Sequence, residues 1–172
     1  MKAVIATVND FSTIAVDGKL PWFDIPELKK LDMGFFKKET MDQHILVGRK
    51  TWENDLKGKP LDGRFIHFVL SSKNVQGDCR VISSVQDIYN NLPYNTVCIG
   101  GASLYDVVLP ICNCVHWTHF IIPGVEGVKT GLCKPINSLL NERMAWKSYV
   151  EEYKLTDKGS ALITTLYRIY TI

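Results

Sequence analysis

The sequence has 172 residues, a length that fits one domain with one hydrophobic core. Apolar residues make up 46% and charged residues 22%, which excludes a disordered, fibrous or coiled-coil chain. The net charge of +2 permits an anionic ligand, but the basic residues do not form the concentrated stripe of a nucleic-acid-binding protein.

The sequence contains no apolar run long enough for a secretory signal or a membrane span. Its five cysteines form no CxxC pair, and their odd number argues against a secreted disulfide framework. We therefore expect a cytoplasmic, monomeric protein with reduced thiols, and neither a membrane nor a nucleic acid as its partner.

In the first half of the chain, strands and helices are predicted to alternate. Ala3–Val8 is a buried strand, and turn-forming residues at 17–22 follow it in an exposed loop. An apolar stripe with lysines on its other side then predicts a helix; the stripe consists of Leu28, Leu31, Met33, Phe35 and Phe36. The elements predicted next are strand 44–47, short helix 50–56, strand 64–71 and strand 80–83.

The second half continues the alternation and ends in a hairpin. Ser84 is the predicted N-cap of a helix over 85–91. The remaining predictions are strand 96–99, a helix from 102 to about 108, strand 115–122 and a hairpin of strands 146–155 and 160–170. This order predicts a single α/β domain over 1–172, with a mostly parallel central sheet, an antiparallel C-terminal hairpin strand and helices on both faces.

Two turns bring together a strand end, a glycine and a helix start, at 47–51 and at 99–103. Such turns present unpaired backbone N–H groups to an anion. Neither turn is the GxGxxG fingerprint, and either one alone is more simply a tight connection without a ligand. Their joint presence, with the polar strand end Ser71-Ser72-Lys73 on the same edge, favours a phosphate ligand.

Six segments in order carry a resemblance to a known family: 18–22 (GKLPW), 47–53 (VGRKTWE), 61–64 (LDGR), 70–72 (LSS), 99–101 (IGG) with Tyr105, and 117–119 (WTH). Together they resemble dihydrofolate reductase, and the similarity runs from Ala3 through Thr118 and faintly into the hairpin. The resemblance implies NADPH-dependent reduction of 7,8-dihydrofolate to 5,6,7,8-tetrahydrofolate, with hydride transfer to C6 and protonation at N5. It also implies a role in one-carbon metabolism and thymidylate synthesis, as an antifolate target.

The resemblance implies an NADPH site around the two turns. Arg49, Lys50, Ser72 and Lys73 would surround the 2′-phosphate, because charge-assisted partners favour NADPH over NADH. Gly100 and Gly101 would cradle the pyrophosphate through a cis peptide bond. Ser103 stands where many members place a basic side chain. The full implied set is Ala6, Thr7, Ile14, Gly48, Arg49, Lys50, Thr51, Leu70, Ser71, Ser72, Gly100, Gly101, Ala102, Ser103 and Leu104.

A folate site is implied by further positions of the same family pattern. Arg64 matches the arginine that clamps the α-carboxylate of the substrate's glutamate, for which a planar fork is suited. The apolar wall and its neighbours are Ile5, Leu20, Phe36, Leu61, Ile99 and Tyr105, of which Leu20 also belongs to the implied catalytic set.

The catalytic carboxylate can be placed at either of two positions. The family's interval from Trp22 leads to Glu27, whereas its pattern of acid, phenylalanine at i+4 and threonine at i+8 fits Asp32, Phe36 and Thr40. Because i and i+4 share a helix face, we prefer Asp32 and place an insertion of about five residues in 23–31, where a loop can absorb it.

The resemblance implies that Trp22 supports the acid through water and that Thr118 bonds it directly. A carboxylate in an apolar pocket has a raised pKa, which suits proton chemistry near neutrality. The segment 14–20 matches the mobile loop of the family. Val128 lies near the place where an acidic residue often helps that loop to close.

Other interpretations stay open. Cys112, Cys114, His116 and His119 cluster like metal ligands, but their spacing and strand alternation lead us to predict no metal site. The alternatives to a folate enzyme are a pyrimidine-reductase-like NADPH enzyme of the same fold and a catalytically silent NADPH- or folate-binding module.

Overall fold

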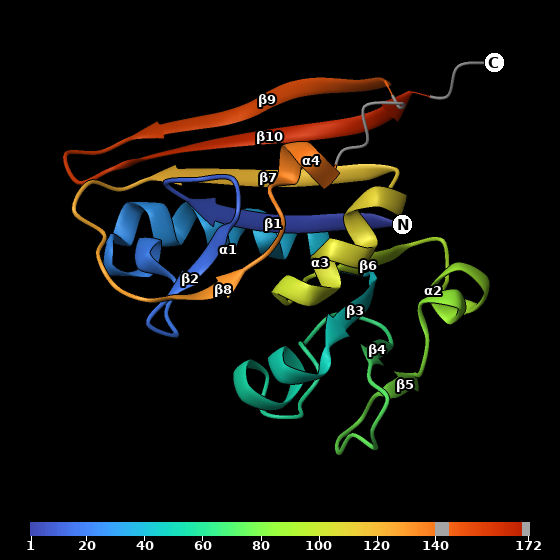
Figure 1. Cartoon of the computed structure of the whole chain (residues 1–172). Coiled ribbons are helices and arrows are strands. Elements are labelled where there is room, and N and C mark those ends of the chain that lie inside the picture. The colour runs from blue at the N-terminus through green and yellow to red at the C-terminus, as the bar shows by residue number, and fades with distance from the viewer. Residues whose placement is uncertain (140–144, 170–172) are drawn as a thin grey trace.

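The structure is a computed structural model and describes residues 1–139 and 145–169. Its centre is an eight-stranded sheet of order β5-β4-β3-β6-β1-β7-β10-β9 (Figure 1). The strands β5 to β7 of this order are parallel, and β10 and β9 are antiparallel. The bounds are β1 (Lys2–Val8), β3 (His44–Gly48), β4 (His67–Leu70), β5 (Arg80–Ile82), β6 (Thr96–Cys98), β7 (Cys114–Ile121), β9 (Ala145–Leu155) and β10 (Ser160–Ile169).

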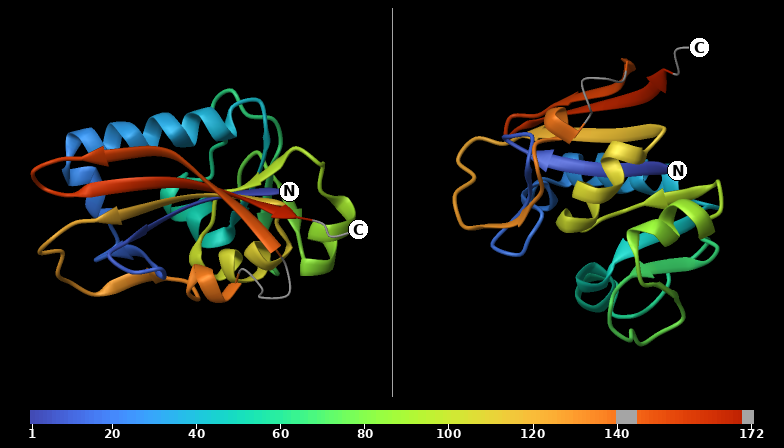
Figure 2. Two further views of the ribbon diagram at one scale, coloured as in Figure 1. Left: turned by 90° about the horizontal axis from the view of Figure 1, so that it is seen from above. Right: turned by 45° about the vertical axis from the view of Figure 1, so that its right-hand side comes forward.

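Helices cover both faces of this sheet, which confirms the predicted fold class (Figure 2). The long helix α1 (Pro26–Thr40) lies on one face, and α3 (Ala102–Val108) lies on the other together with α2 (Val85–Asn91). The chain moves outward from β1 to β3 through α1 and returns from β6 to β7 through α3. Because crossovers between parallel strands are right-handed, connections in opposite directions fall on opposite faces.

The sheet opens at its centre. Strands β1 and β6 pair at Lys2 with Val97 and at Ala3 with Cys98, and there β6 ends. Strand β1 continues to Val8 and pairs with β7 along its whole length. The carboxyl ends of β1 and β6 therefore separate at the point where the chain reverses direction in the sheet, which is where open α/β sheets bind their ligands.

A second, two-stranded sheet was not predicted. It consists of β2 (Thr13–Val16) and β8 (Lys129–Leu132), whose register shifts twice within a few residues. The helix α4 (Ile136–Leu139) and the 3-10 turn η3 (Leu109–Ile111) were also not predicted. These elements of three or four residues are too short to show the apolar periodicity from which a strand or a helix is predicted.

Several predicted boundaries and exposures were wrong. The 17–22 segment is not wholly exposed, because it leads into the 3-10 helix η1 (Pro21–Asp24), where Trp22 is buried. Strand 64–71 begins only at His67, and Met33 of the predicted apolar stripe is exposed. The helix predicted at 50–56 is a π-helical turn, η2 (Thr51–Asp55).

The cap and hairpin predictions are confirmed. Ser84 accepts a hydrogen bond from the backbone N–H of Asp87 at the start of α2, as an N-cap does. The hairpin of β9 and β10 is present, and Tyr170 lies outside the described residues. No helix in the described part of the chain is long and apolar enough to cross a membrane.

Candidate active site

Asp32 lies on α1, and its carboxylate meets Trp22 at the sheet opening. The indole Nε1 of Trp22 donates to Asp32 Oδ2 at 2.9 Å. Trp22 is held in place because it stacks on Phe120 with ring centroids 4.5 Å apart. The prediction that a water links Trp22 to the acid is therefore wrong, because the two side chains are hydrogen-bonded directly.

Burial governs the electrostatics of Asp32. Loss of solvent raises the pKa of Asp32 from its usual 3.8 to about 6, and the hydrogen bond from Trp22 works against that rise. A carboxyl group with this pKa exchanges a proton close to neutral pH, which is a property of general acids and bases.

Glu27 lies elsewhere on α1. It is exposed and lines a cavity of about 480 Å³ between α1 and β9, on the side of the helix away from Asp32. The residues between Trp22 and Asp32 form η1 and the first turn of α1, whereas we expected a loop to absorb them. Because the extra residues are helical, they carry Glu27 away from the opening while Trp22 still reaches Asp32.

Arg64 is held against the last turn of α1. Its Nε and Nη2 donate to Thr40 Oγ1 at 3.1 and 2.6 Å, and its Nη1 donates to the carbonyl of Asp62 at 2.6 Å. The guanidinium also lies 5.9 Å from the centre of the Phe36 ring. Asp32, Phe36 and Thr40 therefore share one helix face, and the far end of that face presents a cation.

The two glycine turns lie against each other. The N–H of Gly48 donates to the carbonyl of Gly100 at 2.6 Å. A Cβ on Gly101 would lie 3.0 Å from Thr51 Oγ1, and one on Gly48 would lie 3.3 Å from the Gly101 nitrogen. The Gly100-Gly101 peptide bond is cis, as predicted. Side chains at these positions would fill the space between the turns, so the glycines preserve a backbone-lined cradle.

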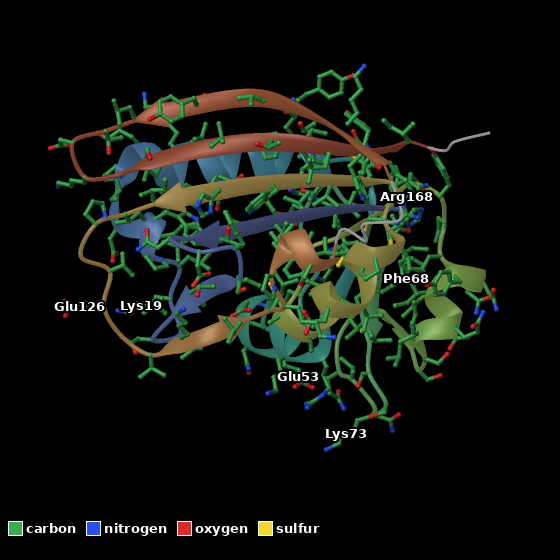
Figure 3. The ribbon with its side chains drawn as sticks, turned by 45° about the horizontal axis from the view of Figure 1, so that its top comes forward. Lys19, Glu53, Phe68, Lys73, Glu126 and Arg168 are labelled. Carbon is green, nitrogen blue, oxygen red and sulfur yellow. The ribbon has the colours of Figure 1, made fainter. Side chains whose placement is uncertain are left out.

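The basic residues near the cradle are not all free. Arg49 donates to Glu53 at 2.7 Å, while Lys50, Ser72 and Ser103 are exposed. Buried Ser71 donates to the carbonyl of Lys73. Glu53 and Lys73 project from the same end of the molecule in Figure 3. Lys50 therefore presents an exposed cation next to the cradle, while Arg49 is shared with the carboxylate of Glu53.

Other predicted site residues carry structural bonds or packing. Tyr105 donates from its hydroxyl to the carbonyl of Val4 at 2.6 Å. The Thr7 hydroxyl accepts from Trp117 Nε1 at 2.9 Å and lies 3.0 Å from His119 Nδ1. These contacts of Trp117 and His119 were not predicted, because only the pairing of β1 with β7 brings the three residues together.

The remaining predicted positions fall around the opening and in the core. Thr118 is buried on β7 beside Ala6 of β1, on the face of the sheet that carries Trp22; its bond to Asp32 stays a prediction. Ile5 and Leu104 are buried in the main core. The half-buried positions are Ala6, Ile14, Leu20, Leu61, Leu70, Ile99 and Ala102.

The loop that leads to Trp22 is hydrogen-bonded to the segment around β8, in part through the carboxylate of Asp17. The N–H of Val128 donates to Asp17 Oδ1 at 2.9 Å, and the N–H of Gly18 donates to Thr130 Oγ1 at 2.7 Å. In this contact the carboxylate thus lies on the loop, at Asp17, and the residue near β8 is Val128.

Comparisons with known proteins agree with this geometry. A family model described as dihydrofolate reductase matches residues 1–127. The dihydrofolate reductase of Buchnera aphidicola from Acyrthosiphon pisum is 32% identical over 123 residues, which cover 70% of this chain and 72% of the relative. That of Bacillus subtilis is 36% identical over 109 residues, which cover 61% of this chain and 60% of the relative.

A solved structure shows the same fold. Dihydrofolate reductase from Enterococcus faecalis, complexed with NADP(H) and RAB-propyl, superposes with a TM-score of 0.75 at 24% identity and covers 97% of this chain and 95% of that chain. Fold, sequence match and relatives place the protein in the class of NADPH-dependent oxidoreductases. The chain belongs to the dihydrofolate reductase family.

Proposed function

We propose that this protein reduces 7,8-dihydrofolate to 5,6,7,8-tetrahydrofolate at the sheet opening, with Asp32 as its single active-site carboxylate. The direct Trp22 to Asp32 hydrogen bond supports this proposal most strongly, because it fixes a carboxyl group whose pKa burial raises to about 6. A half-buried acid that has a fixed orientation is suited to proton chemistry on a ring bound beside it.

Asp32 would hold the pteridine ring and promote protonation of N5, directly or through a water. Its raised pKa means that a proton is available at pH 6 and becomes scarce above it. The rate constant kcat/KM should therefore fall as pH rises from 6 to 8. Trp22 fixes the carboxylate, and buried Phe120 behind the indole keeps bulk water away.

The cradle of Gly48, Gly100, Gly101 and Thr51 fits NADPH, because it offers backbone groups that a Cβ would block. When bound, NADPH supplies the hydride for C6. The exposed cations beside the cradle would face the 2′-phosphate, for which charge-assisted hydrogen bonds give the discrimination against NADH. Ser103 adds no charge there.

The substrate's tail would run along the Asp32, Phe36, Thr40 face of α1 to Arg64. Thr40 and the Asp62 carbonyl orient the guanidinium, so its free edge can bind the glutamate α-carboxylate. The apolar wall would include half-buried Leu20, Leu61 and Ile99.

The test is dihydrofolate-dependent oxidation of NADPH by the wild type, Asp32→Asn and Glu27→Gln. We expect a loss of about 10²- to 10⁴-fold in kcat/KM for Asp32→Asn and none for Glu27→Gln. The reverse order would overturn the Asp32 assignment. A wild type without activity that still binds NADPH or an antifolate would be a silent binding module, and one that instead reduces a pyrimidine substrate would be a pyrimidine reductase.

A further inference from the structure

A chain of polar side chains with a buried histidine at its centre connects α1 to the C-terminal hairpin, outside the site described above. His116 of β7 is 3% exposed, and its Nε2 lies 3.0 Å from Glu39 Oε2 of α1. On its other side, His116 Nδ1 lies 2.9 Å from Thr165 Oγ1 of β10, and Thr165 donates to Glu151 of β9. Four elements are thereby joined through one imidazole.

The bulge in β9 directs a carboxylate into this chain. Ile163 pairs with Glu152 and Thr164 pairs with Val150, so Glu151 is the extra residue. A bulge turns a side chain away from the regular alternation of a strand. Glu151 can therefore reach Thr165 on the α1 side of the sheet, where Glu152 also points into the cavity.

The Glu39 end of this chain of polar side chains is less exposed to solvent than the Glu151 end. The side chains of His116 and Glu39 are 4% and 11% exposed, whereas that of Glu151 is 27% exposed. Lys38 lies 3.5 Å from Glu39 and 3.8 Å from Glu151, but it is 68% exposed and screened by water. Because interactions with a charged group are screened least where water is scarce, the Glu39 to His116 contact should hold α1 more firmly than the contacts of Lys38 do.

The last turn of α1 needs such an anchor. Gly34 lies inside the helix between Asp32 and Glu39, and glycine weakens a helix interior. Beyond Gly34, the ring of Phe35 packs edge-on against the imidazole of His116, with the ring centroids 5.6 Å apart. Glu39 is followed directly by Thr40, whose hydroxyl accepts both bonds from Arg64. An anchor on Glu39 therefore sets the place of the hydroxyl that orients Arg64.

We propose that Glu39 and His116 are positioning residues for Arg64: they fix the last turn of α1 to the sheet and thereby fix the guanidinium that receives the substrate's tail. The inference rests on the proposed function, since it needs the tail to bind at Arg64. It assigns a use to a buried polar chain that the reaction itself does not require.

The test compares two ligands, of which only one has the tail that reaches Arg64. One is dihydrofolate, and the other is a dihydropterin with a methyl group in place of the tail. We expect Glu39→Ala to raise the Kd of dihydrofolate by about tenfold, the effect of one lost hydrogen bond to a charged group. The Kd of the tail-less dihydropterin should change less than about twofold, because it does not reach Arg64.

Matched variants separate positioning from general damage. Glu39→Gln keeps a hydrogen-bond acceptor for His116 and should restore most of the affinity. Glu152→Ala removes a carboxylate from the same bulge and should leave both ligands unaffected. If Glu39→Ala does not fold, Thr165→Val breaks the second link without a change of shape, and the same pair of Kd values is read from it.

The outcomes are distinguishable. Equal loss for both ligands, or loss for neither, contradicts the positioning role. Arg64→Ala serves as the reference: if it leaves dihydrofolate binding unchanged, the proposed tail site is wrong. If Arg64→Ala weakens dihydrofolate while Glu39→Ala does not, only the present inference is wrong.

Discussion

The two sides of the sheet opening are built in different ways. On the α1 side, side chains make the site, and each is oriented by another side chain, as Trp22 orients Asp32 and Thr40 orients Arg64. On the glycine side, backbone makes the site: the absence of side chains at Gly48 and Gly101 keeps the cradle open, and Gly100 leaves room for Tyr105 behind it. Substitutions on the first side should alter chemistry, whereas substitutions on the second should alter shape.

Gly100→Ala should have the largest effect on stability. Gly100 has a φ of 101°, and a Cβ there would lie 2.7 Å from Tyr105 Cε2 in the core. Strain and overpacking together should lower the free energy of unfolding by about 2 to 5 kcal/mol and weaken NADPH binding. Urea unfolding and titration of NADPH fluorescence measure the two losses. A stable variant with full affinity would show that the cradle tolerates side chains.

Asp32→Asn should have the opposite effect on stability while it removes activity. The folded state raises the pKa of Asp32 from 3.8 to about 6, so the ionised carboxylate destabilises the fold above pH 6. At pH 7 the free energy of unfolding of the variant should exceed that of the wild type by about 3 kcal/mol, an upper estimate for a partly buried group. Because the unfolded acid also becomes protonated, the gain should shrink as pH falls from 6 to 4.

Urea unfolding of both proteins at pH 7 and pH 4 measures this gain. Trp22 can still donate to the amide oxygen of asparagine, so the geometry is kept. A gain that is equal at both pH values would mean that ionisation of Asp32 is not its cause.

Arg49→Ala should change cofactor choice more than stability. If Arg49 binds the 2′-phosphate, its loss should raise the KM for NADPH by about 10- to 100-fold and leave that for NADH unchanged. Glu53→Gln releases Arg49 from its 2.7 Å partner and should strengthen the preference for NADPH. Steady-state kinetics with the two cofactors provide the measurement, and equal changes for both would contradict this role.

The smallest effect is expected for the same change, glycine to alanine, at Gly34 on the α1 side of the opening. Gly34→Ala adds a Cβ that meets no atom within 4 Å, and it removes a glycine from a helix interior. Stability should rise by about 0.5 to 1 kcal/mol without a change in dihydrofolate binding. Thermal unfolding checks the sign, which is opposite to that of Gly100→Ala. A loss of stability would indicate that Gly34 has a packing role.

Local signals predicted much of this molecule. The Ser84 cap and the two glycine turns depend on residues that are close in sequence, as do the buried strands, and the structure has these elements at or near their predicted positions. The i, i+4, i+8 spacing of Asp32, Phe36 and Thr40 also placed the carboxylate on the face that meets Trp22. That choice combined the pattern of the resembled family with helix geometry, and the catalytic role of Asp32 stays a prediction.

Contacts between distant residues could not be predicted. Glu39 and His116 meet only because α1 packs on β7, and the sequence showed His116 merely as one of several possible metal ligands. The strands β2 and β8 pair with each other although they are far apart in the sequence, and neither shows an apolar alternation from which a strand could be predicted. Trp22 seemed exposed in a turn-rich segment because its partners Phe120 and Asp32 lie elsewhere in the sequence.

The parting of β1 from β6 after Ala3 and Cys98 links stability to metabolism. Beyond those residues β1 and β6 do not pair, and on the proposed function cofactor and substrate would complete the centre of the sheet. A ligand at 100 times its Kd adds about 2.7 kcal/mol to a fold that it alone recognises. Amide hydrogens of residues 4–8 should therefore exchange more slowly as NADPH accumulates, and the resistance of the enzyme to proteolysis would follow the supply of its own reductant.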